Sequence, residues 1–273
     1  MATKMRLDAL LAARGLFASR SQAATAVMAG EVRLGDEGAP ALKPGALVPQ
    51  DVAVALSERP RYVSRGGLKL ERALGQLGIR VEGRLCLDVG ASTGGFTDCL
   101  LQAGAARVVA LDVAYGELDW RIRTDSRVTV LERQNARELD PRDLPYSPDL
   151  IVVDVSFIGL AKVLPAVVAC AAESFDLLAL VKPQFEVGRE RVGKGGVVRA
   201  APDRLGALVS AGETARALGL SVQRYCSSGV PGPAGNRESF MWCTEAARPG
   251  RPDLRKAALE VEPGAAVGAA LRS

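Results

Sequence analysis

The sequence predicts an α/β protein in which a mostly parallel, doubly wound sheet follows a small α+β module. Between residues 85 and 244, short apolar runs alternate with segments of helical spacing, which is typical of a parallel sheet with helices on both faces. The first 58 residues instead combine short helices with short alternating strands. At 273 residues and 48% apolar content, the chain can bury one core of about 150 to 200 residues beside a small module.

The N-terminal module, residues 1–58, is predicted to hold two helices and a small sheet. Leucines at helical spacing mark the first helix: Leu7, Leu10 and Leu11. A serine, Ser19 or Ser21, can cap the second helix, and Gly30 ends it. The apolar face of that helix is expected at Ala24, Val27 and Met28. Residues 32–34 and 52–56 alternate as strands.

A basic linker over residues 59–65 is expected to join this module to a larger domain over residues 66–245. The larger domain opens with a helix at 66–78. Its seven strands are expected near residues 85–89, 107–112, 128–132, 149–154, 177–182, 221–227 and 239–244. Helices are expected near 95–103, 159–172 and 203–218. Residues 246–273, rich in Ala, Pro, Gly and Arg, are expected to form a flexible tail apart from a helical turn at 254–260.

Charge and residue usage limit the classes of function. A formal net charge of +4 permits an anionic partner without demanding one. The five cysteines are odd in number and show no CxxC spacing, so we expect buried, reduced thiols and a cytoplasmic protein. We find no secretory segment and no apolar run that would span a membrane. The absence of histidine removes the commonest metal ligand and general base, and we expect no metal site.

The stretch LCLDVGASTGGFTDCLL, residues 85–101, combines a buried strand, a glycine-rich turn and a helix. Gly90 and Gly94 allow the backbone to approach a ligand closely, although such turns also serve only to pack a helix on a sheet. The turn lacks the lysine of a phosphate-binding loop and the G-x-G-x-x-G spacing of a dinucleotide fingerprint. Asp88 at the strand end can pair with an ammonium group, and Asp112 closes the next strand where a ribose diol would lie. Together these features favour S-adenosylmethionine as the cofactor.

Four ionisable residues are placed where a doubly wound sheet gathers its ligands. Asp154 in VVDVSFI and Lys182 in LVKPQFE each end an apolar strand, at the carboxyl edge of the predicted sheet. Lys69 and Glu238 accompany them in SRGGLKLE and GNRESF. Each residue alone has a plainer interpretation, as an exposed helix charge or a turn cap. Their joint occurrence favours a catalytic group.

Basic residues recur in the N-terminal module. Residues 1–65 contain nine Lys and Arg against six Asp and Glu, which fits either a solvated face or an anionic partner. The pattern R-L-D-x-x-L-x-x-R-G-L, followed by S-R-x-x-A and G-x-V, resembles the S4 RNA-binding domain. This resemblance implies RNA contacts through Arg6, Arg14 and Arg20. The loop LGDEGAPALKPG, with acidic Asp36 and Glu37, departs from the usual S4 pattern.

The larger domain resembles the Rossmann-like methyltransferase sheet, and its four ionisable residues resemble the Lys-Asp-Lys-Glu tetrad of FtsJ-type ribose 2′-O-methyltransferases. With the S4-like module, YVSRGG, KPQFE, KGGVVR and GNRESF, residues 5–245 resemble the TlyA family, also called hemolysin A. The resemblance implies S-adenosylmethionine-dependent 2′-O-methylation of cytidines in 16S or 23S ribosomal RNA. It also implies that the catalytic residues are Lys69, Asp154, Lys182 and Glu238.

The same comparison suggests roles around the reaction centre. For the cofactor we expect contacts with the methionine part from Asp88, Gly90, Ser92 and Gly94, with the ribose from Asp112, and with the adenine from Asn135. Lys182 is the candidate base; alternatively it stays protonated and orients the hydroxyl while Asp154 or water accepts the proton. A mobile basic loop over residues 187–198 is expected to meet RNA phosphates. The further RNA contacts are expected at Arg65, Arg189 and Lys194.

Other functions remain open at this stage. Within enzymes, the alternative is 2′-O-methylation of another RNA class. A ribosome-assembly factor could use the same surfaces without turnover, but the intact tetrad argues against it. A secreted pore former, suggested by the hemolysin name, conflicts with the missing secretory and spanning segments.

Overall fold

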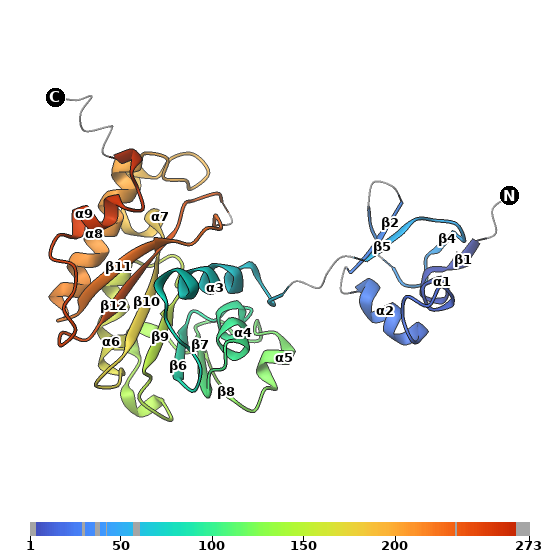
Figure 1. The fold of residues 1–273 in the computed structure, drawn as a ribbon, viewed down its shortest axis with the longest axis horizontal. Helices are drawn as coiled ribbons and strands as arrows, with labels where there is room; N and C mark the ends of the chain where they lie inside the picture. The colour runs from blue at the N-terminus through green and yellow to red at the C-terminus, as the bar shows by residue number, and fades with distance from the viewer. Residues whose placement is uncertain are drawn as a thin grey trace. The chain divides into compact units, whose positions relative to one another are not determined.

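The structure is a computed structural model that describes residues 4–28, 31–35, 39–41, 43–56, 61–232 and 234–265. The chain divides into two compact units, Met1–Arg61 and Tyr62–Ser273, which are described separately here (Figure 1).

The first unit packs two short helices against two small sheets. Strand β1 (Lys4–Arg6) pairs with β4 (Leu47–Pro49), and β2 (Val32–Leu34) lies between β3 (Ala39–Pro40) and β5 (Val54–Leu56), all antiparallel. Helices α1 (Leu7–Ala13) and α2 (Arg20–Met28) follow the predicted positions. The core of this unit is formed by Leu7, Leu10, Leu11, Ala23, Ala26, Val27, Val32, Ala41 and Val48.

The apolar face of α2 differs from the predicted one. Val27 is buried as expected, but Met28 is 71% exposed and Ala24 is half-buried. Ala23 and Ala26 are buried in their place, because positions three and four apart share the helix face that meets α1. Gly30 and the acidic pair Asp36 and Glu37 lie outside the described residues.

The second unit is built on a seven-stranded sheet whose order is β11-β12-β10-β9-β6-β7-β8. Five parallel strands form its body: β6 (Leu85–Val89), β7 (Arg107–Asp112), β8 (Val128–Glu132), β9 (Leu150–Val153) and β10 (Asp176–Val181). Strand β12 (Ser239–Thr244) runs antiparallel between β10 and β11 (Ser221–Ser227). Every strand predicted for this sheet is present, with bounds that agree to within one residue, whereas the strand predicted at 52–56 in the first unit is the shorter β5. The predicted α/β fold is confirmed.

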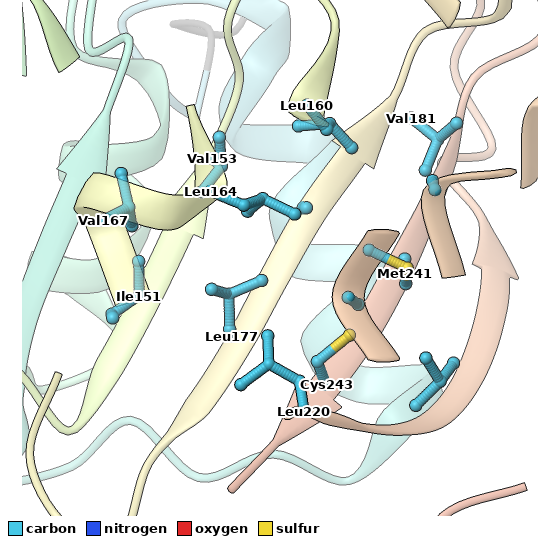
Figure 2. Packing of buried hydrophobic residues seen from close by; sticks show 14 of the residues in the cluster. Ile151, Val153, Leu160, Leu164, Val167, Leu177, Val181, Leu220, Met241 and Cys243 are labelled. Carbon is cyan, nitrogen blue, oxygen red and sulfur yellow. The ribbon is translucent and has the colours of Figure 1, made fainter. Parts of the chain in front are cut away.

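Helices cover both faces of this sheet because each strand sends alternate apolar side chains to opposite sides. One face packs on α6 (Leu164–Ala169), α8 (Ala201–Ala217) and α9 (Leu254–Leu259). Figure 2 shows this core, where Ile151, Val153 and Leu177 of the strands meet Leu164 and Val167 of α6. The other face packs on α3 (Arg65–Leu77), α4 (Gly95–Gln102) and α5 (Trp120–Arg123).

The predicted helix over residues 159–172 is interrupted. A 3₁₀ turn, η3 (Leu160–Lys162), precedes the short helix α6. Pro165 lies in the first turn of α6, where its missing N–H costs nothing, whereas one continuous helix would need that N–H as a donor. The remaining helical segments are α7 (Pro183–Glu186) and the 3₁₀ turns η1 (Ala136–Glu138), η2 (Pro141–Asp143) and η4 (Arg189–Arg191).

Part of the expected linker belongs to the second unit. Tyr62 is buried, and the backbone N–H of Val63 donates to Asp98 Oδ2 at 2.9 Å. The side chain of Ser64 caps α3, which begins at Arg65. These contacts fix residues 62–65 against α4. Residues 57–60 lie outside the described part of the chain.

Residues 246–265 also differ from the predicted flexible tail, because they pack on the sheet domain. Leu254 and Ala258 of α9 are buried in the core beneath α8 and β11. Farther along, Glu262 accepts two hydrogen bonds from Arg204 of α8, at 2.8 and 2.7 Å. The prediction of a flexible tail rested partly on its many alanines. In the structure, Ala257 and Ala258 are the small residues through which α9 packs on the domain. Residues 266–273 lie outside the described residues.

All five cysteines are buried free thiols, as predicted. Among the described residues, no helix is long and apolar enough to cross a membrane. The same residues contain no group of three or more His, Cys, Asp or Glu side chains arranged to hold a metal ion.

The Arg204–Glu262 pair generates a stability test. Both side chains are under a tenth exposed, so Glu262→Ala leaves a buried guanidinium without its carboxylate and should lower the free energy of unfolding by about 3 kcal/mol. Glu260→Ala, which breaks a largely exposed pair with Arg251, should cost under about 1 kcal/mol. Denaturant unfolding measures both. Equal small losses would show that residues 246–265 do not stabilise the domain.

Candidate active site

The ionisable residues of the predicted site gather at the carboxyl edge of the parallel strands. Asp88 is the penultimate residue of β6 and Asp112 the last residue of β7, while Asp154 and Lys182 follow β9 and β10 directly. Because β6, β7, β9 and β10 run parallel, these positions share one edge of the sheet. The sequence-based placement of these residues is therefore correct.

The glycine turn after β6 is pressed against the neighbouring strands. Gly90 has φ of 89°, and a Cβ there would lie 2.6 Å from the carbonyl oxygen of Asp154. The N–H groups of Gly90 and Ala91 both donate to the carbonyl of Leu111, at 2.8 and 3.0 Å. Only glycine fits this position, which ties the turn to β7 on one side and to the segment after β9 on the other.

Asp88 is fully buried at the base of this turn. The hydroxyl of Thr97 donates to its Oδ2 at 2.7 Å, while its Oδ1 has no hydrogen-bond partner within the described structure. Burial raises the pKa of Asp88 to about 7. Asp88 lines neither of the cavities described below, so its contact with the ammonium group of a cofactor stays a prediction.

A cavity of about 370 Å³ opens between the loops that follow β6, β7, β8 and β9. Its wall includes Gly90, Ser92, Asp112, Asn135 and Phe157. Asp112 accepts the N–H groups of Ser92 and Ala114 at 2.7 and 2.8 Å, which fixes its carboxylate at the rim. Asn135 caps η1 by accepting the N–H of Arg137 at 3.1 Å. The cavity has the acidic group and the apolar wall that an adenosine requires.

A second cavity of about 210 Å³ adjoins the first, because Gly90, Ser92 and Asp154 line both. Its remaining wall includes Lys69, Arg65 and Gly95. Gly94, with φ of 96°, forms the N-cap of α4 beside it. The two cavities therefore share part of their walls at the glycine turn.

The four catalytic candidates form two ion pairs, one buried and one partly buried. Lys69 Nζ lies 2.6 Å from Glu238 Oε2, with side chains 9% and 1% exposed. Lys182 Nζ lies 2.6 Å from Asp154 Oδ1 and donates to Ser156 Oγ at 2.8 Å. Lys69 and Asp154, one member of each pair, line the smaller cavity. One ammonium group and one carboxylate therefore border the smaller cavity, and each is ion-paired with a partner that lines neither of the two cavities.

The predicted RNA-binding residues lie in three places. In the first unit, Arg6 and Arg20 both contact Asp8, whereas Arg14 donates to the backbone carbonyls of Val52 and Gln50. Arg14 thus joins α1 to the turn between β4 and β5. In the second unit, Arg65 lines the smaller cavity, and Arg189 and Lys194 are exposed on the loop after α7.

Asn236 is a site residue that the sequence did not reveal. It is 1% exposed, accepts the N–H of Val198 at 2.9 Å and donates to the carbonyl of Gly196 at 2.8 Å. These bonds hold the end of the basic loop beside the segment that carries Glu238. Within GNRESF, Asn236 was visible only as part of a motif, because its partners are main-chain groups about 40 residues away.

Two non-glycine residues with positive φ, Ser92 and Phe157, line the larger cavity, and Arg133, which also has positive φ, precedes Gln134 of its wall. Phe157 is 92% exposed and packs on Phe185 with ring centroids 5.4 Å apart. The guanidinium of Arg133 lies 4.2 Å from the centroid of the Tyr115 ring. Strained backbone of this kind clusters at functional sites, and exposed aromatic rings suit a flat ligand. The sequence carries no signal for these dihedral angles.

Comparisons with known proteins give matches to two family models and to several relatives. A family model described as FtsJ-like methyltransferase matches residues 62–245, and an S4 domain model matches residues 5–38. The chain is 50% identical over 245 residues to "16S/23S rRNA (cytidine-2′-O)-methyltransferase TlyA" of Mycobacterium tuberculosis, covering 89% of this chain and 90% of that protein. It is 47% identical over 198 residues to "Putative rRNA methyltransferase YqxC" of Bacillus subtilis, covering 72% and 70%.

A solved structure extends the similarity to the whole fold. A "Putative hemolysin" from Streptococcus thermophilus shares 38% sequence identity, with a TM-score of 0.73, over 100% of this chain and 99% of that one. Both units of the chain therefore have counterparts in a known structure.

The burial of Asp88 generates a pH test. The native state should keep this proton up to about pH 7, whereas the unfolded chain loses it near pH 4, so the free energy of unfolding should fall as the pH rises through that interval. Asp88→Asn removes the group that titrates. The free energy of unfolding of wild type and of Asp88→Asn is measured by denaturant unfolding from pH 4 to 8. As the pH rises, wild type should lose stability relative to Asp88→Asn. Parallel stability curves would contradict this origin.

Proposed function

We propose the function of this chain from its family: it belongs to the TlyA family, whose methyltransferase domain is FtsJ-like. It methylates the 2′-hydroxyl of cytidine ribose in ribosomal RNA. The observation that carries this proposal is the presence of two ion pairs, the buried Lys69–Glu238 pair and the partly buried Lys182–Asp154 pair, at two adjoining cavities. Ribosomal RNA is the proposed substrate because this is the RNA class named for the TlyA relative.

The cofactor proposed for the two cavities is S-adenosylmethionine, which supplies an electrophilic methyl group on its sulfonium. Asp112 is suited to the ribose hydroxyls and Asn135 to the adenine end. Gly90, Ser92 and Gly94 shape the turn around the methionine part, and the free Oδ1 of Asp88 is suited to the ammonium group. This fit is supported by the donor chemistry and by the close approach at Gly90.

The four residues of the tetrad have different proposed roles toward the 2′-hydroxyl of the ribose. Lys182 is held by Asp154 and Ser156, so its ammonium is fixed where it can bind the 2′-oxygen. With the ammonium of Lys182 donating to the 2′-oxygen, the carboxylate of Asp154 would accept the hydroxyl proton, and the bound cofactor would supply the methyl group. Lys69, paired with Glu238, orients the ribose from the side of α3. Positioning of this kind supplies much of the rate acceleration.

Recognition of the RNA is assigned to basic residues of both units. In the S4 unit these are Arg6 and Arg20, with Arg14 contributing charge while it supports the fold. In the methyltransferase unit they are Arg65, Arg189 and Lys194, all exposed. Their partners are phosphates of ribosomal subunits, so the proposed location is the cytoplasm, where ribosomes are found.

The function is tested by transfer of labelled methyl groups to purified ribosomal subunits, followed by mapping of ribose methylation. Ribose 2′-O-methylation at a cytidine of one or both rRNAs is expected. Label on a base, or no label on either subunit with a chain that binds the cofactor, would contradict the proposal. The second outcome would favour a ribosome-assembly factor without turnover.

The tetrad should act as a unit. Lys182→Ala should lower single-turnover methyl transfer at least about 100-fold, because it removes the group that binds the nucleophile. Asp154→Ala in the same chain should then cost little more. Lys162→Ala, at an exposed lysine, is the matched control and should keep the wild-type rate. Additive losses from Lys182 and Asp154 would mean that the two residues act independently.

Cofactor affinity should depend on Asp112 and be independent of Lys182. Losing a charged hydrogen bond costs roughly 1.5 to 3 kcal/mol, so Asp112→Ala should weaken S-adenosylmethionine binding tenfold or more. Lys182→Ala should bind it as wild type does. Calorimetry measures both, and unchanged affinity in Asp112→Ala would remove Asp112 from the cofactor site.

A further inference from the structure

We propose that Asp8 is a positioning residue that holds Arg6 and Arg20 together as one paired site for phosphate groups of a structured RNA. This inference rests on the proposed RNA-binding function of the S4 unit. The Asp8 carboxylate is negatively charged and would by charge alone weaken RNA binding, but in this proposal it promotes binding.

The contacts of Asp8 orient both arginines. Arg6 donates to both carboxylate oxygens, through Nε to Oδ1 at 3.1 Å and through Nη2 to Oδ2 at 2.8 Å. Arg20 donates through Nη2 to the same Oδ2 at 3.5 Å. A single carboxylate therefore sets the direction and spacing of two guanidinium groups that come from β1 and α2.

Asp8 is itself firmly placed. Its side chain is 7% exposed, and its Oδ1 also accepts the N–H of Ala9 at 2.7 Å. Its own backbone N–H donates to the carbonyl of Pro44 at 2.9 Å. The hydrogen bond from Arg6 is the main cause that lowers the pKa of Asp8 to about 2, so the carboxylate stays ionised near neutral pH.

The two arginines remain available to a ligand. Their side chains are 52% and 60% exposed, and a guanidinium has five N–H donors, of which Asp8 occupies two on Arg6 and one on Arg20. Arg14 differs, because both of its Nη groups donate to main-chain carbonyls. Preorganised guanidinium groups lose less conformational freedom when they bind phosphate.

Charge and positioning predict opposite effects of removing the carboxylate. If Asp8 acts only through its charge, Asp8→Asn adds one unit of positive charge and should strengthen binding to any polyanion. If Asp8 positions the arginines, the same change should weaken binding to structured RNA. Asparagine has nearly the same shape as aspartate and keeps an oxygen that can accept the N–H of Ala9. This hydrogen bond in the first turn of α1 is therefore retained in this variant.

The test compares full-length wild type and Asp8→Asn on two probes. With ribosomal subunits that the wild type methylates, affinity should fall at least fivefold. With heparin, a polyanion without RNA structure, affinity should stay the same or rise. Subunit affinity equal to or above wild type would overturn the positioning role. Absence of wild-type binding to either subunit would overturn the proposed function and this inference with it.

A double-mutant cycle separates positioning from a general loss of structure. In a chain that carries Arg6→Gln and Arg20→Gln, Asp8→Asn should cause no further weakening of subunit binding, because the groups that it positions are gone. An equal fold-loss in both backgrounds would show that Asp8 only supports the fold, and would overturn the proposal. Cofactor affinity, measured in every variant, should not change.

Discussion

The contact between Gly90 and the backbone of Asp154 fixes the geometry of the whole active site. A side chain at Gly90 would meet the Asp154 carbonyl at 2.6 Å, and the N–H of Asp154 donates to the carbonyl of Val89 at 2.8 Å. The glycine turn after β6 and the carboxylate that pairs with Lys182 are thus parts of one hydrogen-bonded edge. Because Gly90 and Asp154 line both cavities, a cofactor bound around the turn must come close to the tetrad.

The buried lysines impose the second constraint. An ammonium group removed from water is costly unless a carboxylate accompanies it, and each lysine here has one at 2.6 Å. Lys69 from α3 and Glu238 before β12 are 169 residues apart in sequence, so their pairing needs the complete sheet. Residues beyond 245 also contribute, because Glu262 holds Arg204 of α8. Arg204 in turn donates to the carbonyls of Val198 and Arg199 at the end of the basic loop.

Sequence patterns predicted the strands because strands depend on short-range regularities, whereas the tetrad was inferred from its resemblance to the FtsJ-type motif. Apolar runs that end in Asp88, Asp112, Asp154 or Lys182 determine which side chains meet at the carboxyl edge. Features that depend on long-range contacts were missed. The packing of α9, the partners of Asn236 and the positive φ of Phe157 arise from surfaces that no local pattern encodes. Met28 and Ala24 were misplaced because a one-residue change in helix phase turns a different face inward.

The most direct test of the arrangement is a crystal structure of the chain with S-adenosylhomocysteine, the unreactive product of methyl transfer. The adenosine should lie between Asp112 and Asn135, with the sulfur beside Gly90 and facing the cavity that Lys69 and Asp154 line. That position would put the methyl group of the reactive cofactor within reach of a ribose held by the tetrad. A ligand bound instead in the separate cavity between Ser227 and Glu238 would contradict it.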